Sequence, residues 1–152
     1  MLDIVENGKI INGVAPTTAA AASKYADWVN MEGLNCIWAI INQTAQATPI
    51  FFAGVVSTDY VGGSPTTASC QYWRSTGILI DKMSASTATT GLALAAVGGI
   101  GICKYTPSGN STQHFFSLNY TSGTNPGRQS VTYIGSPRFG GLNQILATSS
   151  ST

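Results

Sequence analysis

The residues of this chain that could do acid–base or nucleophilic chemistry are few and widely spaced. Its 152 residues include one histidine, His114, and six acids, all within the first 81 positions. Nucleophilic catalysis needs a base beside the nucleophile, and glycoside hydrolysis needs two convergent carboxylates. No serine lies in a G-x-S-x-G pattern, and no two acids lie within two residues of each other. We therefore expect no catalytic residues and no enzyme activity, with a Cys–His pair or two carboxylates from distant strands left open.

Three cysteines, Cys36, Cys70 and Cys103, are the remaining candidate nucleophiles or metal ligands. Their number is odd, none forms a C-x-x-C pair, and each lies in an apolar or aromatic run. Buried, reduced thiols are expected, as suits a protein made in a cytosol. The N-terminus "MLDIVENGKI" has acids where a secretory signal needs basic residues, so no signal peptide is expected. A single histidine with scattered cysteines and aspartates predicts no metal and no cofactor.

The apolar, glycine-rich stretch "GLALAAVGGIGICKY", residues 91–105, allows three interpretations. A transmembrane helix needs about 18 or more apolar residues, and Lys104 interrupts this run too early. A phosphate-binding loop needs a defined glycine pattern followed by a helix. Lys104 stands where G-x-G-x-x-G requires glycine, and Pro107 stops a helix. The stretch therefore predicts two short strand segments with a bulge or bend at Gly98–Gly99, and no membrane partner.

The chain is poor in charge. Charged side chains make up 9% of it, against about 25% in an average protein, while 43% of residues are hydrophobic. A surface of this kind is weakly protected against association, which favours a subunit inside an assembly, although secreted β-proteins are also rich in Ser and Thr. The net charge of +1 predicts no nucleic-acid partner. All acids precede residue 82, so the later basic residues either mix with them in space or form a face for an acidic partner.

Most of the chain is a series of short apolar runs, separated by Gly, Pro, Asn, Ser and Thr at roughly ten-residue spacing. None has the 3.6-residue stripe of an amphipathic helix. The pattern predicts an all-β fold, a jelly-roll-like β-sandwich of about eight strands. We expect an N-terminal arm and linker (1–22), extended or forming an edge strand, then the sandwich (23–141) and a tail (142–152) that is disordered or held by a partner. The expected strand runs are 25–31, 35–43, 49–58, 68–76, 77–83, 91–97, 99–105, 113–120 and 128–135.

Adjacent aromatic residues inside predicted strands indicate a second buried surface. Neighbouring strand side chains face opposite sides of a sheet, so only one member of each pair can face a single core. The other must face a neighbouring subunit, the other side of the sheet, or a groove for sugar or peptide. Because few charged residues are available to form a solvent-exposed side of the sheet, contact with another subunit is the preferred interpretation. The pairs are Phe51–Phe52, Tyr72–Trp73 and Phe115–Phe116.

Four segments, taken in order, resemble a set of small virion proteins of tailed bacteriophages. They are "VENGKIINGVAP", "ADWVNMEGLNCIWAII", "CQYWRST" and "VTYIGSPRFGG". The matching positions are Lys9 to Pro16, Asp27 to Gly33, Tyr72 to Arg74 and Val131 to Phe139. The absence of acids after Asp81 departs from the family, whose region before the last strand is richer in acids.

The resemblance implies a structural protein of the virion, plausibly a capsid decoration or cement protein with a β-sandwich fold. Such a protein would be made in the host cytoplasm, lie on the capsid surface, and bind the major capsid protein and itself as a dimer or trimer. A tail, neck or fibre component with a lectin-like role, using Trp28 with Asp27 or using Trp73, is the alternative. Deleting residues 1–16 is expected to weaken particle attachment more than folding, and equal loss would place the arm in the core. The expected partner interface comprises Ile4, Ile10, Ile11, Val14, Pro16, Trp28, Trp73 and Arg138.

Overall fold

The computed structural model describes residues 9–18, 23–44, 50–76, 79–86, 91–94, 98–108, 114–121 and 128–138. Every regular element within these ranges is a strand, and eight of the strands have seven or more residues. The prediction of an all-β fold is confirmed. The strands are β1 (Lys9–Thr18), β2 (Ser23–Tyr25), β3 (Val29–Asn30), β4 (Leu34–Gln43), β5 (Ile50–Ser57), β6 (Thr66–Thr67), β7 (Cys70–Thr76), β8 (Leu79–Ser86), β9 (Leu92–Leu94), β10 (Gly99–Tyr105), β11 (Phe115–Thr121) and β12 (Arg128–Pro137).

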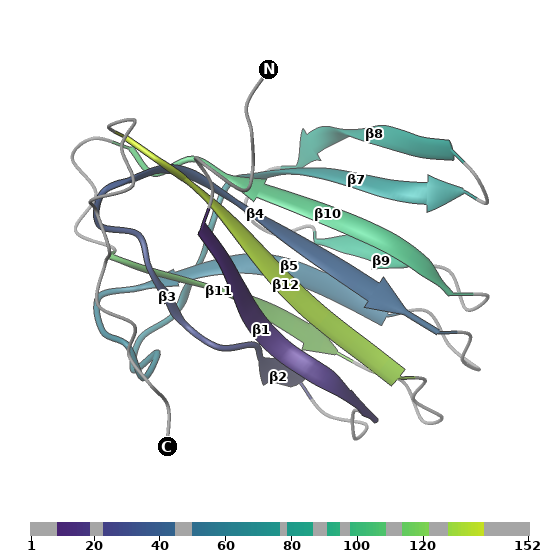
Figure 1. Ribbon diagram of the computed structural model, residues 1–152, viewed down its shortest axis with the longest axis horizontal. Coiled ribbons are helices and arrows are strands. Elements are labelled where there is room, and N and C mark those ends of the chain that lie inside the picture. The colour runs from purple at the N-terminus through teal and green to yellow at the C-terminus, as the bar shows by residue number, and fades with distance from the viewer. Residues whose placement is uncertain are drawn as a thin grey trace.

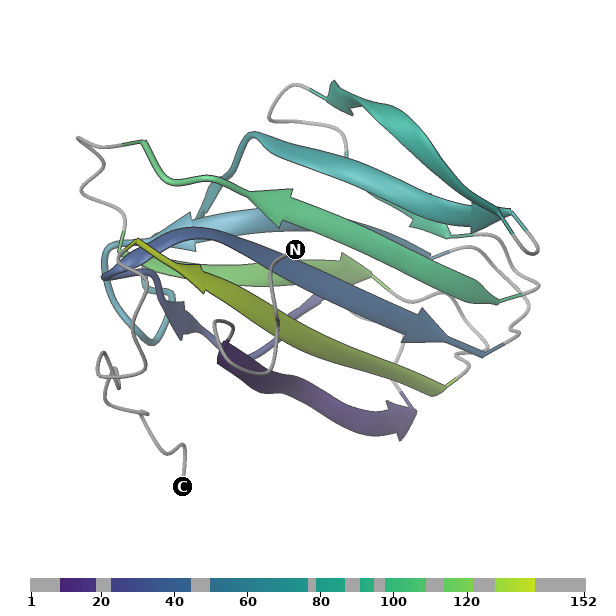
Figure 2. The same ribbon diagram turned by 45° about the horizontal axis from the view of Figure 1, so that its top comes forward.

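The strands form two antiparallel sheets that pack face to face. Sheet A has the order β1-β12-β4-β10-β7-β8, and sheet B has the order β2-β11-β5-β6, with β3 beside β11 and β9 beside β5. Sheet A lies in front of sheet B in Figure 1, and the tilted view of Figure 2 shows its strands fanning out with the twist expected of a sheet. This arrangement confirms the predicted β-sandwich.

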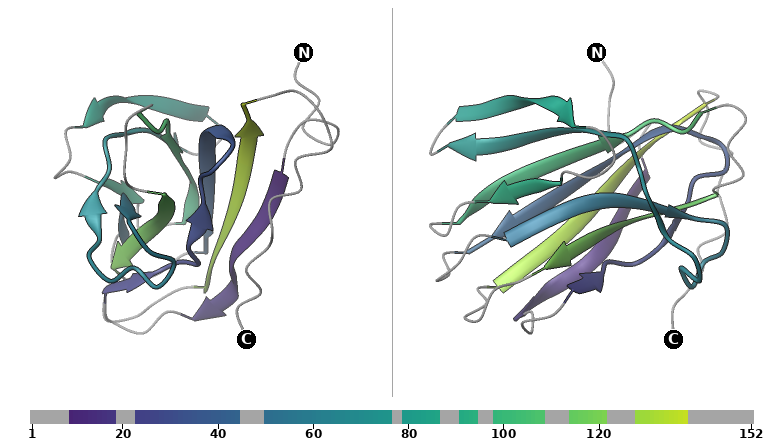
Figure 3. Two further views of the ribbon diagram at one scale, coloured as in Figure 1. Left: turned by 90° about the vertical axis from the view of Figure 1, so that its left-hand side faces the viewer. Right: turned by 180° about the vertical axis from the view of Figure 1, so that it is seen from behind.

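The chain passes repeatedly from one sheet to the other, so neighbouring strands are distant in sequence. β1 pairs with β12 at one side of sheet A, and β10 lies between β4 and β7. Figure 3 shows the two layers end-on and from behind, where β5 and β11 of sheet B come forward. Contacts of such high sequence separation must form before the core is complete, which slows folding relative to a helical bundle.

The core lies between the sheets, and alternation along the strands supplies most of it. On β4, Ile37, Ala39 and Ile41 are buried while the residues between them are partly exposed. Aromatic rings connect the two layers: Phe116 of β11 stacks on Tyr105 of β10, with 5.2 Å between ring centroids. In each predicted aromatic pair one residue is buried, namely Phe52, Tyr72 and Phe116, and its neighbour is more exposed. The expectation that only one member of each pair faces the core is confirmed.

The glycine-rich stretch 91–105 connects the sheets. β9 pairs with β5 in sheet B, and β10 pairs with β4 and β7 in sheet A. Gly98 and Gly99 have φ values of 87° and 152°, a region that residues with a Cβ rarely adopt. The two predicted strand segments are confirmed as β9 and β10, and the positive φ values of Gly98 and Gly99 lie where a bend was predicted. No helix within the described residues has the length and apolar character needed to cross a membrane.

Two forms were expected for the N-terminal segment, an extended arm or an edge strand. Residues 9–18 form an edge strand. β1 runs antiparallel to β12 from Lys9 opposite Gly135 to Thr18 opposite Arg128, with register shifts on either side of Val14. Such irregularities and Pro16 protect a sheet edge against further pairing. Residues 1–8 and the predicted tail 142–152 lie outside the described residues. The sandwich therefore includes residues 9–18 as a strand of sheet A.

The expected strand at residues 25–31 is broken into two short strands. β2 ends at Tyr25 and β3 begins at Val29, with Ala26 to Trp28 between them. The Asp27 amide donates a hydrogen bond to the Gly13 carbonyl of β1 at 2.9 Å, while the Ala26 amide donates to Leu118 of β11 at the same distance. The backbone here divides its hydrogen bonds between the two sheets, so it cannot continue as one strand.

Candidate interaction surfaces

His114 lies at the rim of the sandwich rather than in its core. It immediately precedes β11 and its side chain is exposed, so it lies outside the core face on which Phe116 and Leu118 are buried. Its backbone amide donates to Ser57 at 3.1 Å, and its carbonyl accepts from Met31 at 2.7 Å. The described residues contain no group of three His, Cys, Asp or Glu side chains that could hold a metal ion. The backbone of His114 therefore links the start of β11 to the end of β5 and to the residue after β3.

The three cysteines are free and buried, as the sequence predicts. Cys103 is completely inaccessible, and desolvation raises its pKa well above the usual value, with the thiol of Cys70 beside it adding to the shift. Tyr72, whose pKa is raised by burial, accepts a hydrogen bond from the Gly54 amide at 3.0 Å. Burial also raises the pKa of Cys36, while the charge of Lys104 opposes the shift. Protonated Cys36 and Cys103 are poor nucleophiles at neutral pH.

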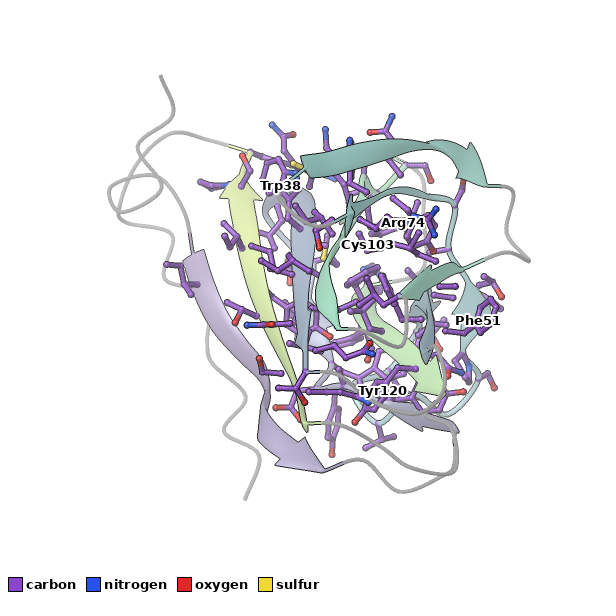
Figure 4. All side chains as sticks on the ribbon, turned by 90° about the vertical axis from the view of Figure 1, so that its right-hand side faces the viewer. Trp38, Phe51, Arg74, Cys103 and Tyr120 are labelled. Carbon is purple, nitrogen blue, oxygen red and sulfur yellow. The ribbon has the colours of Figure 1, made fainter. Side chains whose placement is uncertain are left out.

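The outer side of sheet A carries large apolar side chains. In the register of the sheet, Ile134 and Lys104 lie on either side of Trp38, and Ile102 lies between Ile40 and Trp73 in the next row. Alternation turns these side chains away from the core, and Figure 4 shows Trp38 on the outer side of the sheet. We call this surface the sheet A face, made of Ile10, Trp38, Ile40, Trp73, Ile100, Ile102 and Ile134.

The exposure of the sheet A face is considerable for a surface so apolar. Ile10 on β1 is 61% exposed and Ile100 on β10 is 40% exposed, while its other members are half-buried by one another. Among the outward-facing side chains that the structure describes on this sheet, Lys104 carries the one charge. Its ammonium lies 5.5 Å from the centroid of the Trp38 ring, a cation–π contact that covers the ring with an aliphatic stem.

Sheet B presents a second exposed apolar group on the opposite side. Phe51 of β5 is 60% exposed, whereas its neighbour Phe52 is 1% exposed and faces the core. Figure 4 shows Phe51 at the periphery and Cys103 in the interior. Tyr60 and Val61, in the loop after β5, are 66% and 67% exposed. The molecule therefore has apolar side chains available on both outer sides.

The loop after β5 is shaped by Asp59. Its Oδ1 accepts hydrogen bonds from the amides of Val61 and Gly63 at 3.1 and 2.8 Å. These bonds hold Gly62, with φ of 69°, against the indole of Trp28. Trp28 in turn lies 5.7 Å from the ring of Tyr25, measured between centroids. The result is a small aromatic cluster beside an ordered loop.

The residues expected at the partner interface lie in several places. Ile10 and Trp73 both belong to the sheet A face, separated by β12, β4 and β10. Trp28 lies in the connection between β2 and β3 of sheet B. Arg138 is exposed after β12, where its Nε donates to the Leu34 carbonyl at 3.2 Å and ties the strand end to β4. Ile11, Val14 and Pro16 lie in β1 with side chains outside the described set, and Ile4 lies outside the described residues.

Sequence reasoning did not include five members of the sheet A face among its interface residues. A signal for them exists in the alternation of "GIGIC", which places Gly101 and Cys103 inward and Ile100 and Ile102 outward. A strand with water on one side has the reverse pattern, with large apolar residues inward. This inverted alternation can be recognised only when it is known which residues face inward. The five members are Trp38, Ile40, Ile100, Ile102 and Ile134.

Comparison of the chain with protein-family models, with curated proteins and with solved structures found no match.

Proposed function

We propose that this protein is a structural subunit of a bacteriophage virion, and in particular a decoration or cement protein that binds and stabilises the head shell. The observation that carries the proposal is the exposure of large apolar side chains on both outer sides of the sandwich, with Ile10 61% and Phe51 60% exposed. A subunit that bridges neighbours in a shell needs at least two contact surfaces. The resemblance of its four segments to small phage virion proteins supports the same role.

Apolar burial would supply the stabilisation. Each square ångström of apolar surface removed from water contributes roughly 25 cal/mol, and the low charge of the chain leaves few ions to desolvate. Binding to the assembled shell alone stabilises that state by mass action, without covalent links. The proposal contains no catalytic step, because the thiols of Cys36 and Cys103 are buried with raised pKa values. Buried, reduced thiols suit synthesis in a bacterial cytoplasm.

Co-sedimentation with particles tests this function. Purified protein is mixed with empty shells of the phage that encodes the chain, and the bound fraction is measured against concentration. We expect saturable binding at a fixed number of copies per shell, and a rise in the midpoint of thermal shell disruption. Two variants, Phe51→Ser and Tyr60→Ser, each remove one exposed ring, and their bound fractions are compared with that of the wild type. A protein that never sediments with the shells would contradict the proposal.

A second candidate is a tail, neck or fibre component that binds glycans. The observation that favours it is the aromatic cluster of Tyr25 and Trp28, in which Tyr25 is 46% exposed and the flanking Asp27 is also exposed. Sugar rings stack on exposed aromatic faces while carboxylates accept bonds from hydroxyls. Binding on a glycan array that is lost in Tyr25→Ala and retained in Phe51→Ala would support this candidate. No binding on the array would exclude it.

A further inference from the structure

We infer that the sheet A face is a self-association surface, on which a second copy of this chain packs sheet against sheet. The inference does not depend on the proposed virion role, because a dimer in solution is measurable without any particle. It rests on three features of the sheet A face: the inverted alternation of β10, the area of the face, and its charge.

The alternation of β10 is inverted, and β4 carries large apolar side chains on both of its sides, so these two strands are suited to burial on both sides. On β10, Gly101 faces the core and Ile102 faces outward; on β4, Ala39 faces the core and Trp38 faces outward. A Cβ on Gly101 would lie 2.5 Å from Cζ of Phe52, so the inward side admits no larger residue. On β10 the larger apolar side chains therefore lie outside, as in sheets that are covered on both faces.

The outer side of the five strands that carry the sheet A face, with polar positions such as Asn42 and Gln71 included, reaches the lower limit of what a stable dimer needs. The members of the face extend over five strands, from Ile10 on β1 to Trp73 on β7. With about 4.8 Å per strand and 3.4 Å per residue, five strands of seven residues cover about 24 by 24 Å. Two copies would then bury about 1,200 Å², the lower end of the range for specific, stable interfaces.

The charge and shape of the sheet A face favour a second copy over a charged partner. The one described charge on it, Lys104, lies on the Trp38 ring, and no described acid faces outward there. A largely apolar face with one described charge finds an equally apolar face on its own copy. Two sheets of the same twist also pack aligned, at about 30° between strand directions. A two-fold dimer with the same residues on both sides is the simplest closed assembly that results.

Sedimentation velocity of the purified full chain, from micromolar to submillimolar concentration, tests the inference. We expect a concentration-dependent monomer–dimer equilibrium. The double variant Ile100→Thr/Ile102→Thr keeps β-branched residues on β10 and is expected to raise the dimer dissociation constant roughly tenfold or more. Trp73→Thr on β7 is expected to act in the same direction. Phe51→Thr removes an exposed apolar side chain of sheet B, is the matched control, and is expected to leave the dissociation constant unchanged.

Folding of each variant is checked by its circular dichroism and by its midpoint of urea unfolding. A wild-type chain that stays monomeric at every concentration would overturn the inference, whatever the variants do. So would a dimer that Phe51→Thr disrupts while the folded variants of the sheet A face leave it intact. Particle binding without a solution dimer would overturn this inference and leave the proposed function standing, whereas a dimer without particle binding would do the opposite.

Discussion

At the scale of single residues, the fit between Gly101 and Phe52 explains how the two sheets pack. Phe52 projects from β5 of sheet B onto β10 of sheet A, where a glycine leaves room for its ring. The same ring lies 6.2 Å from that of Tyr72 in an edge-on arrangement. Gly54, two residues after Phe52 and on the same side of β5, leaves room for the thiol of Cys70 in the same manner. Small residues on one sheet thus accept large ones from the other.

Replacing Gly101 by alanine is therefore expected to destabilise the fold by overpacking. The added methyl would lie 2.5 Å from Cζ of Phe52, and a buried ring cannot move aside without disturbing its neighbours. We expect the free energy of unfolding to fall by about 1–3 kcal/mol, measured by urea denaturation.

The control for this prediction is the double variant Gly101→Ala/Phe52→Leu. Leucine removes the ring atoms that the methyl meets, so Gly101→Ala is expected to cost less in the Phe52→Leu background than in the wild type. Costs that simply add would show that the two residues do not compete for the same space.

At the scale of elements, removing β1 tests whether the N-terminal segment is an independent arm or a part of the sandwich. Its Gly13 lies against the ring of Tyr133, which is completely buried, and it accepts the hydrogen bond from Asp27. Deleting residues 1–18 would uncover that ring and the edge of β12. We expect the free energy of unfolding to fall by more than about 2 kcal/mol, with particle attachment lost together with folding.

Deleting residues 1–8 is the comparison for this prediction, because it removes no described strand. It is expected to change the urea midpoint much less. If removal of residues 1–18 leaves the urea midpoint unchanged, β1 contributes nothing to the sandwich, and the segment acts as an independent arm.

Strand positions were largely predictable from the sequence, and sheet partners were not. Runs such as 35–43 and 99–105 match β4 and β10 because alternation and flanking turn residues are local signals. The break between β2 and β3 was missed because it depends on Asp27 bonding to β1, a contact that no local pattern encodes. The sheet A face was missed for the same reason. Its members come from five strands, and only their register brings Ile134, Trp38 and Ile102 together.

At the scale of the whole molecule, burial of titratable groups makes the fold sensitive to alkali. Desolvation raises the pKa values of the Cys36 and Cys103 thiols and of the Tyr72, Tyr120 and Tyr133 phenols. The folded state therefore holds these groups neutral, while the unfolded chain ionises them near their ordinary values of 9.0 and 10.0. Their contribution to stability is fully present below those values and is lost as pH rises above them.

Titration of these thiols and phenols is therefore expected to leave the urea midpoint unchanged between pH 7 and 8. It is expected to lower the midpoint steadily above about pH 9. Return to pH 7 is expected to restore the signal, which separates titration from chemical damage. A midpoint that is constant or rising up to pH 11 would contradict this account of the core.

We propose a subunit whose outer sides are completed by neighbours. Both outer sides carry exposed apolar side chains, the sheet A face through Ile100 and sheet B through Phe51. The charge content of 9% leaves little to keep those surfaces solvated on their own.

For the proposed virion role, electron cryo-microscopy of particles produced from the genome that encodes the chain is the most direct test. We predict density for the sandwich at regular positions on the head shell, with the sheet A face against a second copy and Phe51 against another subunit. Native particles that lack this density, or a sandwich whose two outer sides both face solvent, would contradict it.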